Sequence, residues 1–589
     1  MPINDATNNF NVIVPNNVDL NFDTSGEVAG ISFGSNGSMN FANGQSFVVD
    51  GVAVLNSNVF ADGVGSVFSA LGSVGDLPNN ARVRSLGGAS VSVGALDYNS
   101  TGNVVAIEAD GENSTVNMSN LGSITNTADT FSNNIFARFV ATNGGLVNLS
   151  GLQSIDGGFR DGNFGGTTRN LFEISNGGMM DLTSLQTVSQ LNQFDIDIDS
   201  FQFPSLEQFG STIWNLGGNT NLDTPSLTNV SGTAGPIRSQ VNFQEDSRWT
   251  AAALVALEDM FLNTESGGAI ELPELTVFEN STVFLNSDVD FMTGVLSSID
   301  DSEIHVIDDV AFEIPVQEYA RTRNGSITAL KSDGESSSIS LPNLSAISSS
   351  STNGFTSFVA LNGGFLDLSS VMNIDGGSQA GRNRFELSTQ GFIDFSNLER
   401  IEEQNQFDIN IPAYSLPSLL QLGGTNLNLS TGVVFSTPIL ETVSGSTSSV
   451  AIPIFSTWEA PLLTSLNDIN VSLEVGGTLD APNVSSFQNS SVSLQPGIEF
   501  IVANLTSIDN SRFSVAGGEV LRLHAVSFNR DRIFNNDAFR ANGPNSAIIA
   551  EDLTSITNTT PLPTGFIVSI TNFIAENGGL IDFANLNFV

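Results

Sequence analysis

Four mostly apolar residues recur along this chain at one spacing, i, i+2, i+5 and i+8. Val147, Leu149, Leu152 and Ile155 form one such quartet, in the stretch NGGLVNLSGLQSI of residues 143–155. Eighteen quartets align, and their first residues are Val116, Val147, Met180, Phe201, Leu222, Trp249, Ile270, Phe291, Ile339, Leu366, Ile393, Tyr414, Phe435, Trp458, Leu479, Phe500, Ile548 and Ile581. Such a pattern indicates a repeat protein, in which each repeat buries its apolar face against its neighbours.

Two periods are superimposed in this pattern. Several neighbouring quartets begin 21 residues apart, as Phe201 and Leu222 do, and longer gaps contain Gly- and Asn-rich insertions. The stretch NQFDIDI of residues 192–198 returns as NQFDINI in residues 405–411, at an offset of 213 residues. We therefore expect coils of about 21 residues that are arranged in long repeats of roughly 213 residues.

The spacing favours strands over helices. The first two quartet positions alternate as in a β-strand, and the last two follow a bend into a second short strand. Proline, which fits such a corner and disrupts a helix, often follows the second position, as at Pro204, Pro273, Pro342, Pro417 and Pro482. We predict an all-β fold, a parallel β-helix (β-solenoid), with the quartets buried and stacked from coil to coil.

The repeats divide the chain into four predicted regions. Residues 1–83 are expected to form an N-terminal cap and irregular first coils, and residues 84–315 the first long solenoid repeat. Residues 316–530 would form the second long repeat and residues 531–589 the start of a third. Because an open solenoid end exposes strand edges, we expect the end at Val589 to be covered by a longer chain or by another copy, head to tail.

The coil motifs resemble those of known β-helix families. FPSLEQFG at residues 203–210 and TPSLTNVSG at residues 224–232 resemble the coil signature of receptor-L-domain and fungal cell-wall β-helix proteins. The Asn-Gly-Gly units are similar to repeats of bacterial secreted β-solenoid adhesins. This resemblance covers most of residues 84–589. It implies a surface or extracellular protein that is structural or ligand-binding and mostly non-enzymatic, and it carries over no site residues.

Composition narrows the choice of partners. With 62 acidic and 18 basic residues the formal net charge is −44, which repels nucleic acid and anionic membranes. The absence of cysteine excludes disulfides and thiol nucleophiles. No apolar run is long enough to span a bilayer, so we expect no membrane insertion. The first residues, MPIND, lack the features of a signal peptide, so export is expected to use a removed leader or a signal outside this chain.

One row of acidic residues is a candidate metal site. Asp195, Asp197 and Asp199 alternate with apolar residues, which predicts three carboxylates on the solvent face of one strand, about 7 Å apart. The second long repeat keeps Asp408 and has Asn410 at the next position. Carboxylate oxygens suit Ca²⁺, which makes Ca²⁺ the candidate cofactor and these four aspartates its candidate ligands. The alternative is a solvated strand face that discourages edge pairing.

No catalytic signature is present, and we expect no enzyme. Carboxylates around His305 would suit acid–base chemistry, but the corresponding stretch from Asp509 lacks most of them, which favours surface charge for Asp300, Asp301, Glu303, Asp308 and Asp309. The chain has two histidines and one lysine, and no nucleophile elbow or phosphate-binding loop. Trp249 and Trp458 are expected in the core rather than on the surface as sugar platforms.

The sequence as a whole favours a non-catalytic, extracellular structural or adhesive β-solenoid, a bacterial cell-surface, filament or matrix protein. A glycan-binding module is the alternative, and it would show exposed aromatic residues along one face. A polysaccharide-active enzyme ranks third, and it would need carboxylates from neighbouring coils paired in a cleft. The expected partners are further copies of the chain or glycan, and neither nucleic acid nor a membrane.

Overall fold

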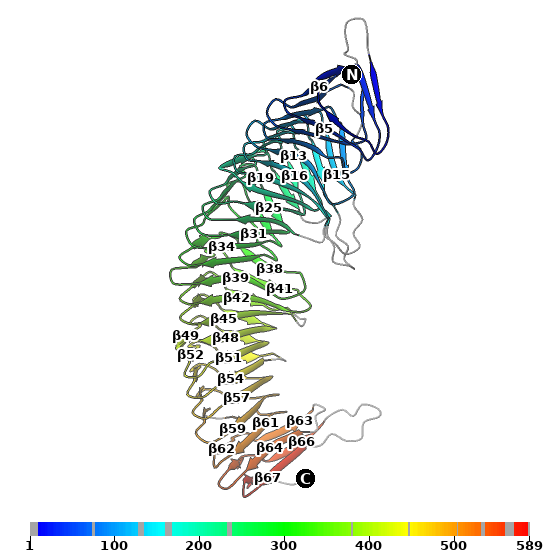
Figure 1. Cartoon of the computed structure of the whole chain (residues 1–589). Helices are drawn as coiled ribbons and strands as arrows, with labels where there is room; N and C mark the ends of the chain where they lie inside the picture. The colour runs from blue at the N-terminus through cyan, green and yellow to red at the C-terminus, as the bar shows by residue number, and fades with distance from the viewer. Residues whose placement is uncertain are drawn as a thin grey trace. The chain divides into compact units, whose positions relative to one another are not determined.

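The computed structural model describes residues 10–72, 77–127, 135–158, 168–231, 238–377, 381–445, 448–502, 505–531, 536–559 and 571–586. All regular secondary structure in these ranges is β-strand, and the strands pair in parallel (Figure 1). Two compact units, Met1–Leu296 and Ser297–Val589, divide the chain. The predicted all-β parallel β-solenoid is confirmed, with turns of about 23 residues. The predicted boundaries of the long repeats stay predictions.

One coil contains three strands. In one coil of the first unit these are β16 (Ile135–Thr142), β17 (Leu146–Asn148) and β18 (Ser154–Asp156). They pair with the strands of the preceding coil, β13 (Val104–Asp110), β14 (Thr115–Asn117) and β15 (Ser123–Asn126). The first quartet residue lies on the second strand and the fourth on the third strand, so the predicted bend within each quartet is confirmed.

In the first unit the strands form three faces. The long sheet extends from β2 (Asp19–Phe22) to β34 (Thr282–Leu285). The second face comprises two sheets, from β3 (Gly26–Val28) to β20 (Met179–Asp181) and from β23 (Ser200–Gln202) to β35 (Asp290–Thr293). The third face extends from β12 (Asp97–Ser100) to β33 (Val277–Glu279).

The second unit repeats this plan. Its long sheet extends from β36 (Glu303–Ile307) to β67 (Thr571–Glu576). Its second face comprises sheets from β37 (Ala311–Glu313) to β46 (Phe392–Asp394), from β49 (Ala413–Ser415) to β60 (Glu499–Ile501) and from β62 (Val520–Arg522) to β68 (Leu580–Asp582). Its third face extends from β38 (Glu318–Arg321) to β56 (Ser465–Leu466), followed by the pair β63 (Ser527–Arg530) and β66 (Ser555–Asn558).

The quartet residues stack in register, as predicted. Val147 pairs with Val116 on one side and with Met180 on the other, and all three are buried. Most quartets are buried in full, because each coil covers the apolar face of the next. Quartet residues in the coils that end a second-face sheet, at β35, β60 and β68, are less covered. Those that are half-buried include Phe291, Thr293, Phe500, Ile581, Phe583 and Leu586. Val589 lies outside the described residues.

Aromatic ladders fill the space behind the long sheet. Phe139, Phe172 and Phe194 stack with ring centroids 4.7 and 4.5 Å apart. In the second unit Phe358, Phe385 and Phe407 stack in the same way, at 5.0 and 4.7 Å. These separations are those of offset-stacked rings, which contribute beyond their buried area. Trp249 and Trp458 are fully buried, so their predicted place in the core is confirmed.

The Asn-Gly-Gly units are tight corners between the first and second strands of a coil. Asn143 and Gly144 both have positive φ, 54° and 80°, a conformation that asparagine and glycine tolerate best. The third residue, Gly145, is a glycine for another reason, because a Cβ there would collide with the carbonyl oxygen of Ala109 in the preceding coil. The corner therefore needs this residue order, which explains why the motif recurs.

In each unit the strands of the second face stop pairing between two successive coils, and the two interruptions lie at equivalent quartets. β20 and β23 carry successive quartets but belong to different sheets, and so do β46 and β49. A hollow of about 220 Å³ lies at the first break and one of about 490 Å³ at the second. At the second break the Tyr414 hydroxyl donates to the carbonyl oxygen of Ile393 at 2.8 Å, and so satisfies a strand carbonyl.

β-Bulges mark the long sheet at three equivalent places. They occur between Val105 and Ile107 in β13, between Thr328 and Leu330 in β39, and in β64 (Asn536–Asn542) between Asp537 and Phe539. The extra residue is a buried alanine each time, Ala106, Ala329 or Ala538. Bulges are specific features rather than defects, so the three sites indicate three related segments.

Two of the three buried tryptophans donate to threonines of the preceding coil, whereas the Nε1 of Trp214 has no hydrogen-bond partner among the residues that the structure describes. Trp249 Nε1 donates to Thr224 Oγ1 at 3.0 Å, and Trp458 Nε1 donates to Thr437 Oγ1 at 3.0 Å. Thr224 and Thr437 occupy the second quartet position, where all other quartets except the one with Thr293 carry an apolar residue. The hydroxyl is therefore the partner that allows an indole N–H to be buried at this point.

We expect Thr437→Val to destabilise the protein by about 1–3 kcal/mol, because the buried Trp458 N–H would lose its acceptor. The free energy of unfolding in denaturant, followed by near-UV circular dichroism, measures the loss. Thr478→Val is the matched control, since Thr478 lies half-exposed on β58 (Thr478–Asp480) and should change stability by about 0.5 kcal/mol or less. Equal effects of the two substitutions would contradict this account.

Candidate functional site

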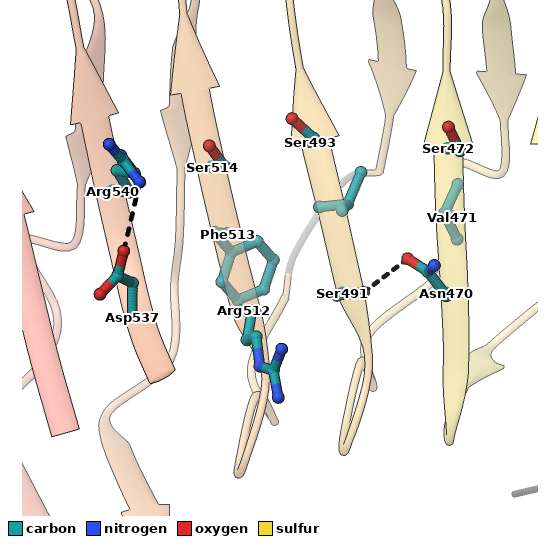
Figure 2. A pocket seen from close by; sticks show the side chains of 11 residues that line it. Asn470, Val471, Ser472, Ser491, Ser493, Arg512, Phe513, Ser514, Asp537 and Arg540 are labelled. Carbon is teal, nitrogen blue, oxygen red and sulfur yellow. Dashed lines mark hydrogen bonds and ion pairs between the residues drawn. The ribbon is translucent and has the colours of Figure 1, made fainter. Parts of the chain in front are cut away.

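A polar groove lies on the outer face of the long sheet in the second unit. It crosses β57 (Ile469–Leu473), β59 (Ser491–Leu494), β61 (Arg512–Ala516) and β64, and its volume is about 380 Å³. These four strands pair in parallel, one per coil, so equivalent positions recur across the groove. Figure 2 shows the side chains that line it.

Two rows of outward side chains form the floor of the groove. Ser472, Ser493 and Ser514 are paired in register and form one row, which ends at Arg540 (Figure 2). Adjacent strands are about 4.8 Å apart, so this row presents a hydroxyl at each step of that length.

The second row contains Asn470, Ser491 and Arg512. Ser491 Oγ donates to Asn470 Oδ1 at 2.6 Å, which fixes the amide orientation. Both rows can therefore donate to and accept from a polar ligand.

The arginine at one end of the groove is already paired. Arg540 donates to Glu576 Oε1 from Nη2 at 2.6 Å and from Nε at 2.9 Å, and its Nη1 lies 3.5 Å from Asp537 Oδ2. The hydrogen bonds that Arg540 donates to Glu576 raise the pKa of Arg540 above its ordinary value. The groove thus offers oriented charges without a large excess of positive charge.

Small side chains keep the groove open at this bulge. At the first bulge the equivalent outward position holds Arg84, which pairs with Glu108 across the strands. At the second it holds His305, whose Nε2 lies 2.9 Å from the Thr328 carbonyl oxygen within the bulge. Ser514 takes that place at the third bulge. A serine leaves the space that an arginine or an imidazole fills elsewhere.

The surface charge that the sequence predicted for the cluster around His305 is present at Asp308 and Asp309, which are exposed, but not at Asp301. Asp301 and His305 are both buried, with 8% of each residue exposed. Asp301 forms an ion pair with Arg321 at 2.7 Å and accepts from the backbone N–H of Thr322 at 2.9 Å. The prediction failed because sequence spacing could not show that Asp301 turns inward at a left-handed corner, with a φ of 58°.

The hydrogen bonds and the ion pair of Asp301 lower its pKa more than burial raises it. Burial alone would raise the pKa of this carboxyl, but hydrogen bonds from Thr322 and Arg323 and the charge of Arg321 hold the pKa below its ordinary value. The same corner occurs at Asn80 and Asn510, which also have left-handed φ, and there an amide replaces the carboxylate. Asp301 is therefore a charged version of a recurrent structural corner.

The four predicted calcium ligands belong to two units, with Asp195, Asp197 and Asp199 in the first and Asp408 in the second. Asp195 is on β22 (Asn192–Asp197) and accepts from Asn215 Nδ2 at 2.6 Å, whereas Asp408 accepts from Asn428 Nδ2 at 2.7 Å in the other unit. Asp197 and Asp199 are exposed, and Asp199 lies beyond the end of β22 rather than on the same strand. The expectation of three carboxylates on one strand was wrong in that respect, because the chain bends after Asp197 into β23.

Among the residues that the structure describes, no three histidine or acidic side chains come close enough to hold a metal ion. The calcium site stays a prediction. No helix within the described ranges could cross a membrane.

Sequence reasoning did not single out the groove, although one signal was present. Residues 512–540 contain five arginines and three acidic residues, in a chain whose net charge is −44. A locally basic stretch in an acidic chain points to a distinct surface. The serine rows could not be found in this way, because serine is frequent throughout the sequence and its register depends on the fold.

No protein-family model and no curated protein matches this chain.

We expect Asp301→Asn to destabilise the protein by about 3–5 kcal/mol at pH 7, because the buried Arg321 would lose its counter-charge. Because the folded-state pKa of Asp301 is lowered, its contribution is present above the unfolded pKa of about 3.9 and is lost as the pH falls through the folded value. Unfolding free energies measured between pH 7 and pH 2 test both statements: the difference between wild type and variant should shrink with acid.

The double variant Asp301→Asn with Arg321→Ser is the matched control. It reproduces the pair found at the first such corner, where Ser100 Oγ lies 3.3 Å from Asn80 Oδ1. Since no buried charge remains, its stability should recover part of the loss. A double variant that is less stable than Asp301→Asn would contradict the ion-pair explanation.

Proposed function

We propose that this protein is a non-catalytic structural or adhesive β-solenoid of the bacterial cell surface or extracellular matrix. The observation that carries the proposal is the outer face of the long sheet, where polar side chains are linked from coil to coil. Asn242 Nδ2 donates to Asn215 Oδ1 at 2.7 Å, and Asn215 in turn donates to Asp195. Such rows give a rigid, hydrated surface that suits repeated contacts with a partner.

The net charge supports the same proposal. A value of −44 keeps a protein soluble and discourages contact with nucleic acid and anionic lipid. The groove across β57, β59, β61 and β64 is a polar hollow on this surface, and it is the site at which we place adhesion. Buried polar groups such as Asp301 and His305 are engaged in corners and bulges, which assigns them a structural role.

Adhesion and turnover can be tested together. Beads coated with the chain are presented to bacterial and animal cells, and attachment under flow is counted. In parallel, soluble polysaccharides are incubated with the protein and assayed for new reducing ends and for unsaturated products. We expect attachment without either product. Turnover of any polysaccharide would contradict the non-catalytic assignment, and a lack of attachment to every surface would contradict the adhesive one.

Self-association belongs to the same proposal. A structural solenoid extends its function by stacking copies head to tail, and heterologous contacts of this kind generate filaments. Light scattering over a range of concentrations measures it: a molar mass that rises with concentration supports a filament-forming role, and a constant monomer mass opposes it.

We expect millimolar Ca²⁺ to raise the melting temperature by a few degrees, on the order of 1 kcal/mol, because divalent cations relieve repulsion among the acidic side chains. Melting curves in Ca²⁺ and in chelator at matched ionic strength measure the shift. The double variant Asp197→Asn with Asp199→Asn separates a local site from a general charge effect, since only a local site would lose most of the shift. Identical curves for the wild type would remove the calcium proposal.

A further inference from the structure

A strained aromatic residue lies at a corner of the coil that precedes the first strand of the groove. Phe455 has a φ of 58°, in the left-handed region, and 72% of its surface is exposed. The equivalent corner positions in neighbouring coils are glycines, Gly432, Gly476 and Gly497, with φ between 76° and 80°. Glycine adopts this conformation without strain and a bulky residue does not, so the exposed Phe455 costs stability that folding does not need.

The ring of Phe455 lies against the next coil. A Cβ placed on Gly476 would be 2.8 Å from Cδ1 of Phe455 and 3.0 Å from Cε1, so the ring fits there only because position 476 is a glycine. The ring is supported by the backbone on one side and is open to solvent elsewhere. An aromatic residue held in this way offers a flat apolar surface at little cost in side-chain entropy.

Further apolar side chains extend this surface along the corner. Val475 is 51% exposed and lies near Gly497, and Ile454 is 40% exposed beside Phe455. These three residues, Ile454, Phe455 and Val475, form what we call the apolar corner. It rests on two successive coils, those of β54 (Ser448–Ile452) and β57.

The apolar corner and the polar groove adjoin. Val475 follows Ser472 of the groove by three residues, which places the two within about 11 Å of one another. β54, which leads into Phe455, pairs with β57, the first strand of the groove. One surface therefore combines an exposed aromatic ring with rows of hydroxyl and amide groups.

We propose that this combined surface binds an uncharged polysaccharide, with a sugar ring stacked on Phe455 and the hydroxyl groups of the chain hydrogen-bonded to the serine rows. This inference rests on the proposed adhesive function and names its ligand. Sugar rings have apolar faces and polar edges, which match a flat ring beside Ser472 and Ser493. A polymer suits the site because equivalent groups recur about every 4.8 Å across the strands.

The overall charge favours an uncharged ligand over an acidic one, although the groove itself is lined by two arginines, Arg512 and Arg540, and one acid, Asp537. The protein has a net charge of −44, and Arg540 is already paired with Glu576 and Asp537. An anionic chain would meet repulsion from the surface as a whole and would have to displace existing ion pairs. A neutral chain meets neither cost.

Binding is measured by affinity electrophoresis and calorimetry with three soluble probes: hydroxyethyl cellulose, mannan and polygalacturonate. We expect at least one neutral probe to bind and polygalacturonate not to bind. Phe455→Gly should weaken binding about tenfold or more, as the loss of a central aromatic contact does, while the melting temperature stays equal or rises because the strain is removed. Phe455→Tyr keeps the ring and should retain binding.

A substitution in the groove tests the contribution of the serine row to binding. Ser493→Glu places a carboxylate in the middle of the first row and should reduce binding to the same extent, whereas Thr478→Glu, on the adjacent second face, should not. Loss of binding in Phe455→Gly without loss of fold, together with retention in Phe455→Tyr, supports the proposal.

Three results would overturn the proposal: no binding of either neutral probe, binding of polygalacturonate alone, or full binding by Phe455→Gly. The failure of this inference differs from a failure of the proposed function. Beads that attach to cells although no neutral polysaccharide binds would leave the adhesive function standing, with a different ligand. Beads that attach to nothing would remove both.

Discussion

Parallel pairing between coils sets the register on which the rest of this protein depends. Side chains alternate between the two faces of a strand, so a slip of one residue would turn the stacked quartets outward. Buried amides specify the register further. Asn170 donates to Asn192 at 3.1 Å, and Asn383 donates to Asn405 at 3.2 Å at the equivalent place in the second unit. Apolar stacking tolerates small shifts, but a buried amide loses its partner when the register changes.

The fixed register lets equivalent positions diverge in chemistry while the backbone is kept. The left-handed corner holds Asn80, Asp301 or Asn510, and each side chain reaches the following coil. The position that faces it holds Ser100 in the first case and Arg321 in the second. Asparagine and serine form a neutral pair, and aspartate and arginine form a charged one. At the third corner Asn510 stands opposite the buried Arg530, so an amide can replace the carboxylate while the arginine is kept.

The sequence predicts the second and third strands of each coil better than the first. The quartets place Val147 and Ile155 on adjoining strands, since their spacing is fixed and their side chains are apolar. The long-sheet strands carry only short alternation and follow insertions of variable length, so neither their pairing nor the bulges could be derived. Asp301 was misplaced for a related reason: an acidic residue at a corner has the same sequence signature whether it turns inward or outward. The groove depends on which outward residues happen to align, which sequence spacing alone does not show.

Stacking also determines where a solenoid can carry function. Inward positions are committed to the core, where Phe385 and Phe407 each support the next coil, so a change there affects neighbours on both sides. Outward positions and corners are free of that demand, because their side chains contact few others. Residues that fit poorly into the fold can persist only at such places.

Phe455 is of this kind: the three neighbouring glycines show what the corner needs for folding, so selection for folding alone does not explain a phenylalanine there. Its exposure and its support on Gly476 are the observations behind the proposed ligand contact.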